Sequence, residues 1–431
     1  MSTNSSFTHR VRGLVITPLV DSLNAFKGNA RACILVEPLW GISYNLFLPY
    51  ASLYMLALGV TEAGIGAMAT LSMVLQVFWS FVAGWITDRF GRRRTSLVFD
   101  LISWTLPTLL WAFAQDFRWF LAATIFSSCI RVVHISWSCL FIEDSPNHLR
   151  VRLYTWLAVA GTVSGFFAPL AGLLVNRFGL VMATRGLYLF AFVAMTSMFF
   201  LRNAFTTETQ IGKLNMIEAR SIGRTKMLSE YREAARFLFG NKEAVLAFLL
   251  AVLSNIHLQV RNSFISIILT KGIGLPVSLI SAFPPLTALV TLGAYLFIIP
   301  RIKHIRGALS LSLGANVAAN LILFFAPSSS FSLALAIEAT ILGTFAAAIG
   351  MGVAGPVVDA VLANSVDENR RASILSIVYT LMFAASAPFG WIAGLIAEIG
   401  ARLPALLCAL VMAIAVVLAL MLKKEERSKL S

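Results

Sequence analysis

Residues 84–94 read Gly84-Trp85-Ile86-Thr87-Asp88-Arg89-Phe90-Gly91-Arg92-Arg93-Arg94. This stretch joins two apolar runs, over residues 63–87 and 96–115. Each run has about the 20 residues that an α-helix needs to cross the hydrocarbon core of a bilayer. Arginines clustered between two such runs predict a short connection that stays on the cytoplasmic side of a membrane.

Apolar runs of this kind recur along all 431 residues. Hydrophobic residues make up 58% of the chain and charged residues 13%, about half the roughly 25% that soluble domains carry. This composition excludes an ordinary water-soluble protein. The predicted spans cover residues 32–58, 63–87, 96–115, 119–142, 153–175, 180–201, 243–270, 276–300, 307–326, 330–356, 373–398 and 402–422.

The basic residues are distributed unevenly between the two sides of these spans. Of the 34 Lys and Arg, 27 lie in the termini and connections of one side, 5 lie on the other side, and Arg131 and Arg261 fall inside spans. The positive-inside rule explains this pattern for an even number of helices with both termini in the cytoplasm. The net charge of +14 therefore reflects topology, and we expect no nucleic-acid partner.

We predict an all-α polytopic membrane protein with twelve transmembrane helices in two six-helix bundles related by pseudo-two-fold symmetry. The two halves share a pattern, because Arg152 precedes Pro169 and Arg371 precedes Pro388 by the same seventeen residues. The central loop carries apolar residues at helical spacing from Met216 to Phe239, which predicts an amphipathic helix that is either a plain linker or a regulatory element. The predicted parts are a cytoplasmic segment 1–31, a first bundle 32–201, the central loop 202–242, a second bundle 243–422 and a cytoplasmic tail 423–431.

The stretch from Gly84 to Arg94 resembles the signature loop of the major facilitator superfamily, G-x-x-x-D-[RK]-x-G-R-[RK]-[RK], at every fixed position. We expect Gly84 to permit close helix packing, Gly91 to form a tight turn, and Arg89 and its neighbours to hold the loop at the cytoplasmic face. The resemblance implies a conformational latch in which Asp88 meets the start of span eleven. It also implies that Arg92 pairs with an acid at the end of span four, where Glu143 and Asp144 stand.

Ionisable groups inside the spans need a partner or a function, because burying a charge in lipid is unfavourable. Glu37 lies in span one, with Asn45 about two turns further along. It is a candidate for proton coupling, and fixed pairing with Arg131 or a lipid headgroup is the alternative. Arg131 in span four resembles an arginine that the family links to proton movement, but His134 replaces the glutamine of that motif, and a structural salt bridge is the competing interpretation.

The second half also carries polar residues within its spans. Asn255, His257 and Arg261 in span seven are too many for a lipid-facing stripe, so we expect some of them to line a wet cavity. Glu338 in span ten is predicted to be a buried acid that complements Arg261 or binds a cationic solute.

Span five contains residues that pack or bend a helix: Gly161, Gly165, Pro169 and Gly172. They partly resemble the glycine-rich motif of the family's proton-coupled exporters, with Ala168 and Leu173 in place of two glycines. This resemblance favours export over uptake. Pro388 is the matching bend in span eleven.

These observations together predict a secondary active transporter of a small molecule that works by alternating access in the plasma membrane. The first expectation is proton-coupled export of a drug-like or amphipathic compound, and the alternative is proton-coupled uptake of a nutrient or an organic anion. A membrane-embedded enzyme is a remote alternative, since the buried acids and histidines are scattered. We expect a monomer in the lipid bilayer, no metal site and no cofactor, with protons and their gradient as the driving force.

Overall fold

The computed structural model of the protein describes residues 27–146, 149–218, 240–302, 304–364 and 371–422. All regular structure in these residues is helical. Eleven helices there are long and apolar enough to cross a membrane, and a shorter apolar helix covers Val277–Gly293. With this broken eighth span, the structure has the predicted twelve-helix layout.

The first half of the chain contains spans one to six, and several of these spans consist of more than one helical segment. Its elements are α3 (Gly28–Phe47), η2 (Leu48–Tyr50), α4 (Ala51–Ala57), α5 (Glu62–Phe90), α6 (Arg92–Asp100), η3 (Leu101–Thr105), α7 (Leu106–Ala112), α8 (Phe117–Ser127), α9 (Ile130–Ile142), α10 (Arg150–Gly165), α11 (Ala168–Phe178) and α12 (Leu180–Phe205).

A short helix, α13 (Gln210–Glu218), follows the first half, and the second half begins with α15. The elements of the second half are α15 (Lys242–Ile267), η5 (Ile268–Gly272), η6 (Val277–Ala282), α16 (Phe283–Gly293), η7 (Ala294–Ile298), η8 (Ile299–Arg301), α17 (Ile305–Phe325), α18 (Leu333–Asn364), α19 (Arg371–Ser386), α20 (Pro388–Ile399) and α21 (Leu403–Leu420).

The breaks in spans five and eleven have an identifiable cause in the sequence. Proline lacks the backbone N–H that continues a helix and clashes with the preceding turn. Span five is interrupted between α10 and α11, just before Pro169, and span eleven is interrupted at Ala387, just before Pro388. The two halves therefore bend at matching positions.

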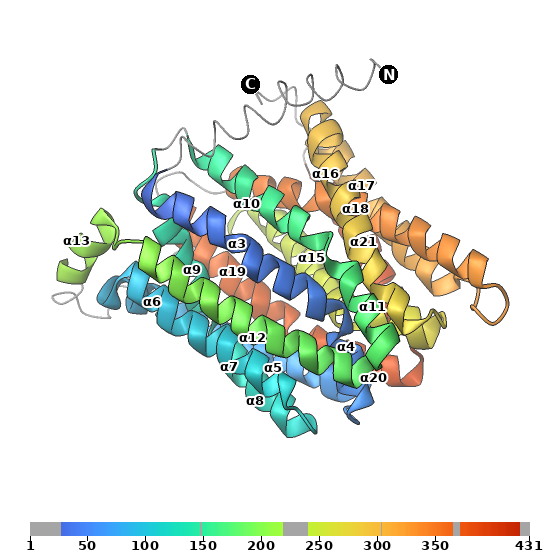
Figure 1. Ribbon diagram of the computed structural model, residues 1–431. Coiled ribbons are helices and arrows are strands. Elements are labelled where there is room, and N and C mark those ends of the chain that lie inside the picture. The colour runs from blue at the N-terminus through green and yellow to red at the C-terminus, as the bar shows by residue number, and fades with distance from the viewer. Residues whose placement is uncertain (1–26, 147–148, 219–239, 303, 365–370, 423–431) are drawn as a thin grey trace, which may run out of the picture.

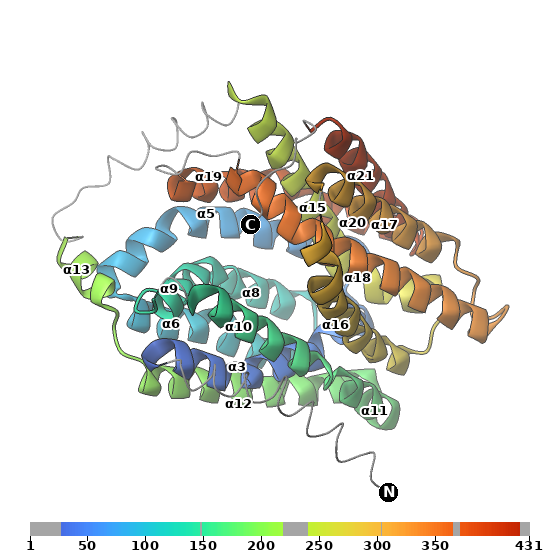
Figure 2. The same ribbon diagram turned by 90° about the horizontal axis from the view of Figure 1, so that it is seen from above.

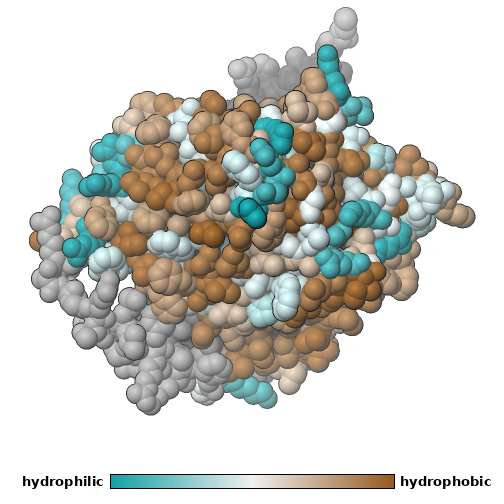
Figure 3. Space-filling view, turned by 90° about the horizontal axis from the view of Figure 1, so that it is seen from below, coloured by the Kyte–Doolittle hydropathy of each residue, from teal (hydrophilic) through white to brown (hydrophobic). Residues whose placement is uncertain are grey.

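Figures 1 and 2 show two bundles that lie side by side. The blue to green helices of the first half form one, and the yellow to red helices of the second half form the other. Apolar side chains dominate the face shown in Figure 3, as expected for a surface that faces lipid. The chain is a multi-pass membrane protein.

The two bundles contact each other closely at the ends opposite the basic loops, which is the extracellular side. Gly66 of α5 lies so close to Gly390 and Gly394 of α20 that a Cβ atom at any of these positions would collide with a neighbouring atom. Nearby, the Thr70 Oγ1 hydroxyl donates to the carbonyl of Ala387 at 2.6 Å. Small residues let the two backbones approach, so the extracellular side is closed by direct helix-to-helix packing.

Candidate functional site

The signature stretch is not a loop but two helices joined at one residue. Helix α5 continues to Phe90, α6 begins at Arg92, and Gly91 between them has a φ of 84°. This conformation favours glycine, so the predicted tight turn is present. A Cβ on Gly84 would meet no atom of the described residues within 4 Å, so its role in close helix packing stays a prediction.

Arg92 occupies the centre of a cluster of charges at the cytoplasmic end of the first bundle. Its guanidinium lies 3.0 Å from the Asp88 carboxylate and 3.1 Å from that of Glu143, and the Arg92 side chain is only 4% exposed. The structure thus brings together three of the residues that the sequence assigned to the latch. Arg89 lies apart from them, over the Trp85 ring at 5.3 Å.

Latch acids also contact the segment that leads out of the first bundle. Asp88 accepts a hydrogen bond from Asn215 of α13 at 2.9 Å, and Asp144 accepts one from the backbone N–H of Gln210 at 3.2 Å. Asp88 was expected to contact the start of span eleven. The side chains there lie outside the described ones. The predicted amphipathic helix of the central loop falls mainly on residues 219–239, which also lie outside the described residues.

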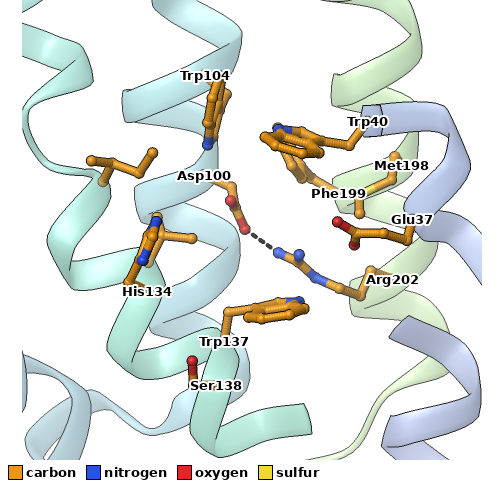
Figure 4. Close-up of a pocket in the computed structure, with 12 residues that line it drawn as sticks. Glu37, Trp40, Asp100, Trp104, His134, Trp137, Ser138, Met198, Phe199 and Arg202 are labelled. Atoms are coloured by element: carbon orange, nitrogen blue, oxygen red, sulfur yellow. Dashed lines mark hydrogen bonds and ion pairs between the residues drawn. The ribbon is translucent and has the colours of Figure 1, made fainter. Parts of the chain in front are cut away.

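A second site lies deeper, inside the first bundle. A cavity of about 160 Å³ opens between α3, α6, α9 and α12 (Figure 4). Three tryptophans, two acids, one arginine and one histidine contribute to its walls. The lining residues are Glu37, Trp40, Asp100, Trp104, Ile130, Val133, His134, Trp137, Ser138, Met198, Phe199 and Arg202.

The cavity contains a buried ion pair between Asp100 and Arg202. The Arg202 Nη2 atom donates to the Asp100 carboxylate and to the Ser96 hydroxyl, the latter at 2.9 Å. The sequence prediction counted Arg202 as the first basic residue of the central loop, which was wrong, because α12 extends to Phe205 and the Arg202 side chain is only 4% exposed. Asp100 and Arg202 thus form an interhelical ion pair between α6 and α12.

Glu37 faces this ion pair rather than Arg131. Figure 4 shows its carboxylate beside the Arg202 guanidinium, on the side away from Asp100. Within the described part of the chain, Glu37 forms no hydrogen bond. Arg131 instead donates from Nε to the Gln76 side chain at 2.9 Å, and its guanidinium lies 3.8 Å from the centre of the Phe383 ring in the other bundle. The predicted Glu37–Arg131 pair is therefore absent from the described contacts.

The aromatic walls of the cavity are held in place by stacking. The Trp40 ring stacks on Tyr44 at 4.9 Å and meets Trp104 edge to face at 5.2 Å. On the opposite side of the ion pair, Trp137 stacks on Phe141 at 5.2 Å. Such pairs prefer these geometries, so the rings are fixed before any ligand arrives.

The polar residues of span seven form a separate group in the second bundle. The His257 imidazole is fully buried and lies 3.0 Å from the Asn320 amide. Asn255 Nδ2 and Arg261 Nη1 are buried with no hydrogen-bond partner among the described residues. Glu338 does not join them: its side chain is exposed near the extracellular start of α18, so the prediction of a buried acid was wrong.

The span-five residues occupy different environments. Gly172 packs against the backbone of Ser278 in the other bundle, and Gly165 lies near Asn45, so that a Cβ on Gly165 would be 3.7 Å from the Asn45 side chain. A Cβ on Gly161 would meet no atom within 4 Å in the part of the chain that the structure describes. Asn45 itself donates to the Gly41 carbonyl at 2.8 Å.

Sequence reasoning missed the three cavity tryptophans, although a signal was present. In spans one, three and four, a tryptophan follows an ionisable residue by three or four positions: Glu37 and Trp40, Asp100 and Trp104, His134 and Trp137. Residues at this spacing lie on one face of a helix. Among the described residues, no group of three or more His, Cys, Asp or Glu is arranged to hold a metal ion.

The sequence also matches a family model, described as Major Facilitator Superfamily, over residues 39–343. The chain belongs to the Major Facilitator Superfamily. The fold and the family are those of a membrane transporter of small solutes, and not those of an enzyme.

Solved structures of superfamily transporters share the fold at low sequence identity. The nucleoside transporter NupG, in a point-mutant form, matches with a TM-score of 0.73 and 14% identity, over 91% of this chain and 99% of that chain. The D-xylose-proton symporter matches with a TM-score of 0.67 and 13% identity, over 90% and 96%. A POT family transporter in complex with 5-aminolevulinic acid matches with a TM-score of 0.65 and 12% identity, over 91% and 94%.

A relative by sequence is the uncharacterized membrane protein YJR124C of Saccharomyces cerevisiae. It is 28% identical over 181 residues, which cover 38% of this chain and 40% of that protein. The matched region is thus less than half the length of this facilitator's curated relative.

Proposed function

We propose that this transporter couples solute movement to a proton gradient and exports a small amphipathic compound, with Glu37 as the residue that takes up and releases the proton. The observation that carries the proposal is the position of Glu37. Its carboxylate lies in an aromatic cavity inside the first bundle, beside Arg202 and without a hydrogen bond among the described residues.

The depth of Glu37 suits a proton carrier. It stands five residues into the predicted span 32–58, and a rise of 1.5 Å per residue places it about 8 Å from the cytoplasmic end of that span. That distance is about a quarter of the roughly 30 Å hydrocarbon core. A carboxylate at this depth that reaches a cavity can exchange a proton as access changes from one side of the membrane to the other.

The closed extracellular side supports alternating access as the mechanism. The packing of Gly66 against α20 and the 2.6 Å hydrogen bond from the Ser52 hydroxyl to the Ser263 carbonyl join the two bundles there. Transport requires these contacts to separate and re-form while the bundles rock around the central site. Small residues allow the surfaces to close without interlocking side chains.

The preference for export rests on span five. Its bend before Pro169 and the contact of Gly172 with Ser278 place the exporter-like residues at the boundary between the bundles. The cavity volume of about 160 Å³ is below the roughly 300–1,000 Å³ of sites for drug-sized ligands. We therefore propose a small amphipathic compound in preference to a drug-sized one.

Proton-coupled uptake of an organic anion is a second candidate. Arg261 Nη1 is buried without a hydrogen-bond partner among the described residues, and Arg131 lies at the boundary between the bundles against Phe383. Two arginines from opposite halves are the groups that would recognise a carboxylate between them. This candidate requires flux of an anion in the opposite direction to export.

Flux in proteoliposomes under an imposed pH gradient tests the proposal. The probes are a nucleoside, 5-aminolevulinic acid, D-xylose and tetramethylammonium, each with the purified full chain. We expect proton-driven export of at least one probe, loss of its pH dependence in Glu37→Gln, and its retention in Glu338→Gln, the matched change of an exposed acid. Flux that is independent of the pH gradient, or flux that keeps its pH dependence in Glu37→Gln, would show that Glu37 does not couple transport to protons.

A further inference from the structure

We infer that the cavity between α3, α6, α9 and α12 binds a small organic cation, a protonated or quaternary amine held between tryptophan faces and the Glu37 carboxylate. This inference rests on the proposed function and names the chemical class of its solute. Four observations carry it: the charge of the cavity, its aromatic walls, its size and its accessibility.

The cavity contains one acid, Glu37, that lies outside the Asp100–Arg202 ion pair. Asp100 and Arg202 neutralise each other in an ion pair in which neither side chain is more than 4% exposed. With Glu37 ionised and His134 neutral, the cavity has a formal charge of −1. Arg202 lies close enough to lower the cost of this charge, but its hydrogen bonds go to Asp100 and Ser96. A bound monocation would make the site neutral.

The walls present the groups that stabilise such a cation. Trp40 and Trp104 lie on one side of the ion pair and Trp137 on the other (Figure 4). The faces of aromatic rings carry negative potential, and tryptophan attracts cations most strongly. The resident Arg202 already uses this property, because its guanidinium lies 5.5 Å from the Phe199 ring. The same faces repel an anion, which would also meet the Glu37 carboxylate.

The volume restricts the ligand to a small one. A cavity of about 160 Å³ equals roughly five water molecules at ~30 Å³ each. A tetramethylammonium group or a short amine is of this scale, whereas a multi-ring compound is not. The stacked rings of Trp40, Tyr44 and Trp104 resist expansion of the wall that they form.

The cavity can be reached without unfolding the bundle. Glu37, Trp40, Trp104 and Trp137 are only partly buried, and the His134 side chain is exposed. The Asp100–Arg202 pair between the tryptophans is buried. Glu37 and the tryptophans are therefore more accessible to a ligand than the ion pair is.

Calorimetric titration of the purified full chain in detergent at neutral pH tests the inference, with tetramethylammonium chloride as the probe and sodium acetate as the anionic comparison. We expect tetramethylammonium to bind and acetate not to bind. Glu37→Gln should weaken binding about tenfold or more, since it removes the charged partner. Trp40→Leu should weaken it about threefold to tenfold through the lost cation–π contact, and Trp40→Phe should weaken it less.

Matched controls change an acid and a tryptophan outside the cavity. Glu338 is exposed and Trp391 is 51% exposed on α20, so Glu338→Gln and Trp391→Leu should keep the affinity within about twofold. Thermal unfolding of each variant identifies any that fails to fold. If Glu37→Gln fails, the comparison of Trp40→Leu with Trp40→Phe still decides the question.

The outcomes separate this inference from the proposed function. No binding of tetramethylammonium to the native chain, equal binding by Glu37→Gln, or binding of acetate in its place would overturn the cation site. If Glu37-dependent proton coupling of another solute persists in that case, the proposed function stands alone. If tetramethylammonium binds but Glu37→Gln leaves the pH dependence of flux unchanged, the cation site is supported and the role of Glu37 in proton coupling is contradicted.

Discussion

Arg202 of α12 and Asp100 of α6 form an ion pair inside the first bundle, and their side chains are 4% and 2% exposed. Two charges removed from water in this way depend on each other, because the loss of one leaves the other buried and uncompensated. The pair also forms the wall that Glu37 and the cavity tryptophans face (Figure 4). The geometry of the site therefore depends on this pair, although neither residue needs to touch the solute.

Removing one partner of the pair should destabilise the protein more than removing both. We expect Asp100→Asn to cost about 3–5 kcal/mol of stability, and the double variant Asp100→Leu with Arg202→Leu to cost less. Denaturant unfolding in detergent, followed by tryptophan fluorescence, measures both. Costs that simply add would contradict the mutual dependence of the two charges.

The charge cluster at the signature stretch predicts unequal roles for its two acids. Glu143 is 12% exposed and Asp88 is 44% exposed, although both contact Arg92. We expect Glu143→Gln to lower stability by about 2–3 kcal/mol, because charged hydrogen bonds to a buried guanidinium are lost. Asp88→Asn should cost less than about 1 kcal/mol, as for a solvent-screened pair. Equal losses in thermal or denaturant unfolding would contradict this difference.

The glycine contact between the bundles predicts a conformational effect. A side chain at Gly394 would collide with the backbone of Glu62 and Ala63 on α5, so Gly394→Val should hold the extracellular side open. A membrane-impermeant maleimide should then label Ser52→Cys, a position 7% exposed in the closed form, several-fold faster. The matched change Gly161→Val, which meets open space, should leave labelling unchanged. Slow labelling in Gly394→Val would show that this contact does not control closure.

The segment after α12 predicts a capping effect on α6. The Glu208 carboxylate accepts from the backbone N–H groups of Arg92 and Arg93 at 2.9 and 3.0 Å. Glu208→Ala should lower stability by about 1–2 kcal/mol, as the loss of a helix cap does. Lys213→Ala, a change of an exposed residue on α13, is the control for denaturant unfolding. No difference between the two would show that water replaces the cap.

The fold was largely predictable, since spans in lipid must satisfy their own backbone hydrogen bonds and therefore appear as long apolar runs. The basic connections then gave the orientation. Hydropathy is a local average, however, and it misplaced the ends of helices. Arg202 stands next to a polar loop in the sequence, so no local signal shows that α12 carries it into the bundle.

The site was harder to predict because it depends on which helix faces meet. Glu37 was recognised as a candidate from its position in a span, but its neighbour is Arg202, 165 residues later, and not Arg131. The same limit explains the wrong prediction for Glu338. Its apolar neighbours in the sequence suggested a buried acid, but its face of α18 points outward. Only the tryptophans that follow ionisable residues in three spans pointed to a common cavity.

The bonds between the first bundle and the segment that follows it decide where this polypeptide can be cut into two co-expressed fragments. Asn29 binds the Thr207 backbone in both directions, at 2.8 and 2.9 Å, and Asn215 holds Asp88. A fragment that stops at Phe205 would lose all of these bonds along with the Glu208 cap. A gene split after Glu218 keeps them in one piece, and so gives the better starting point for reassembling the transporter from its halves.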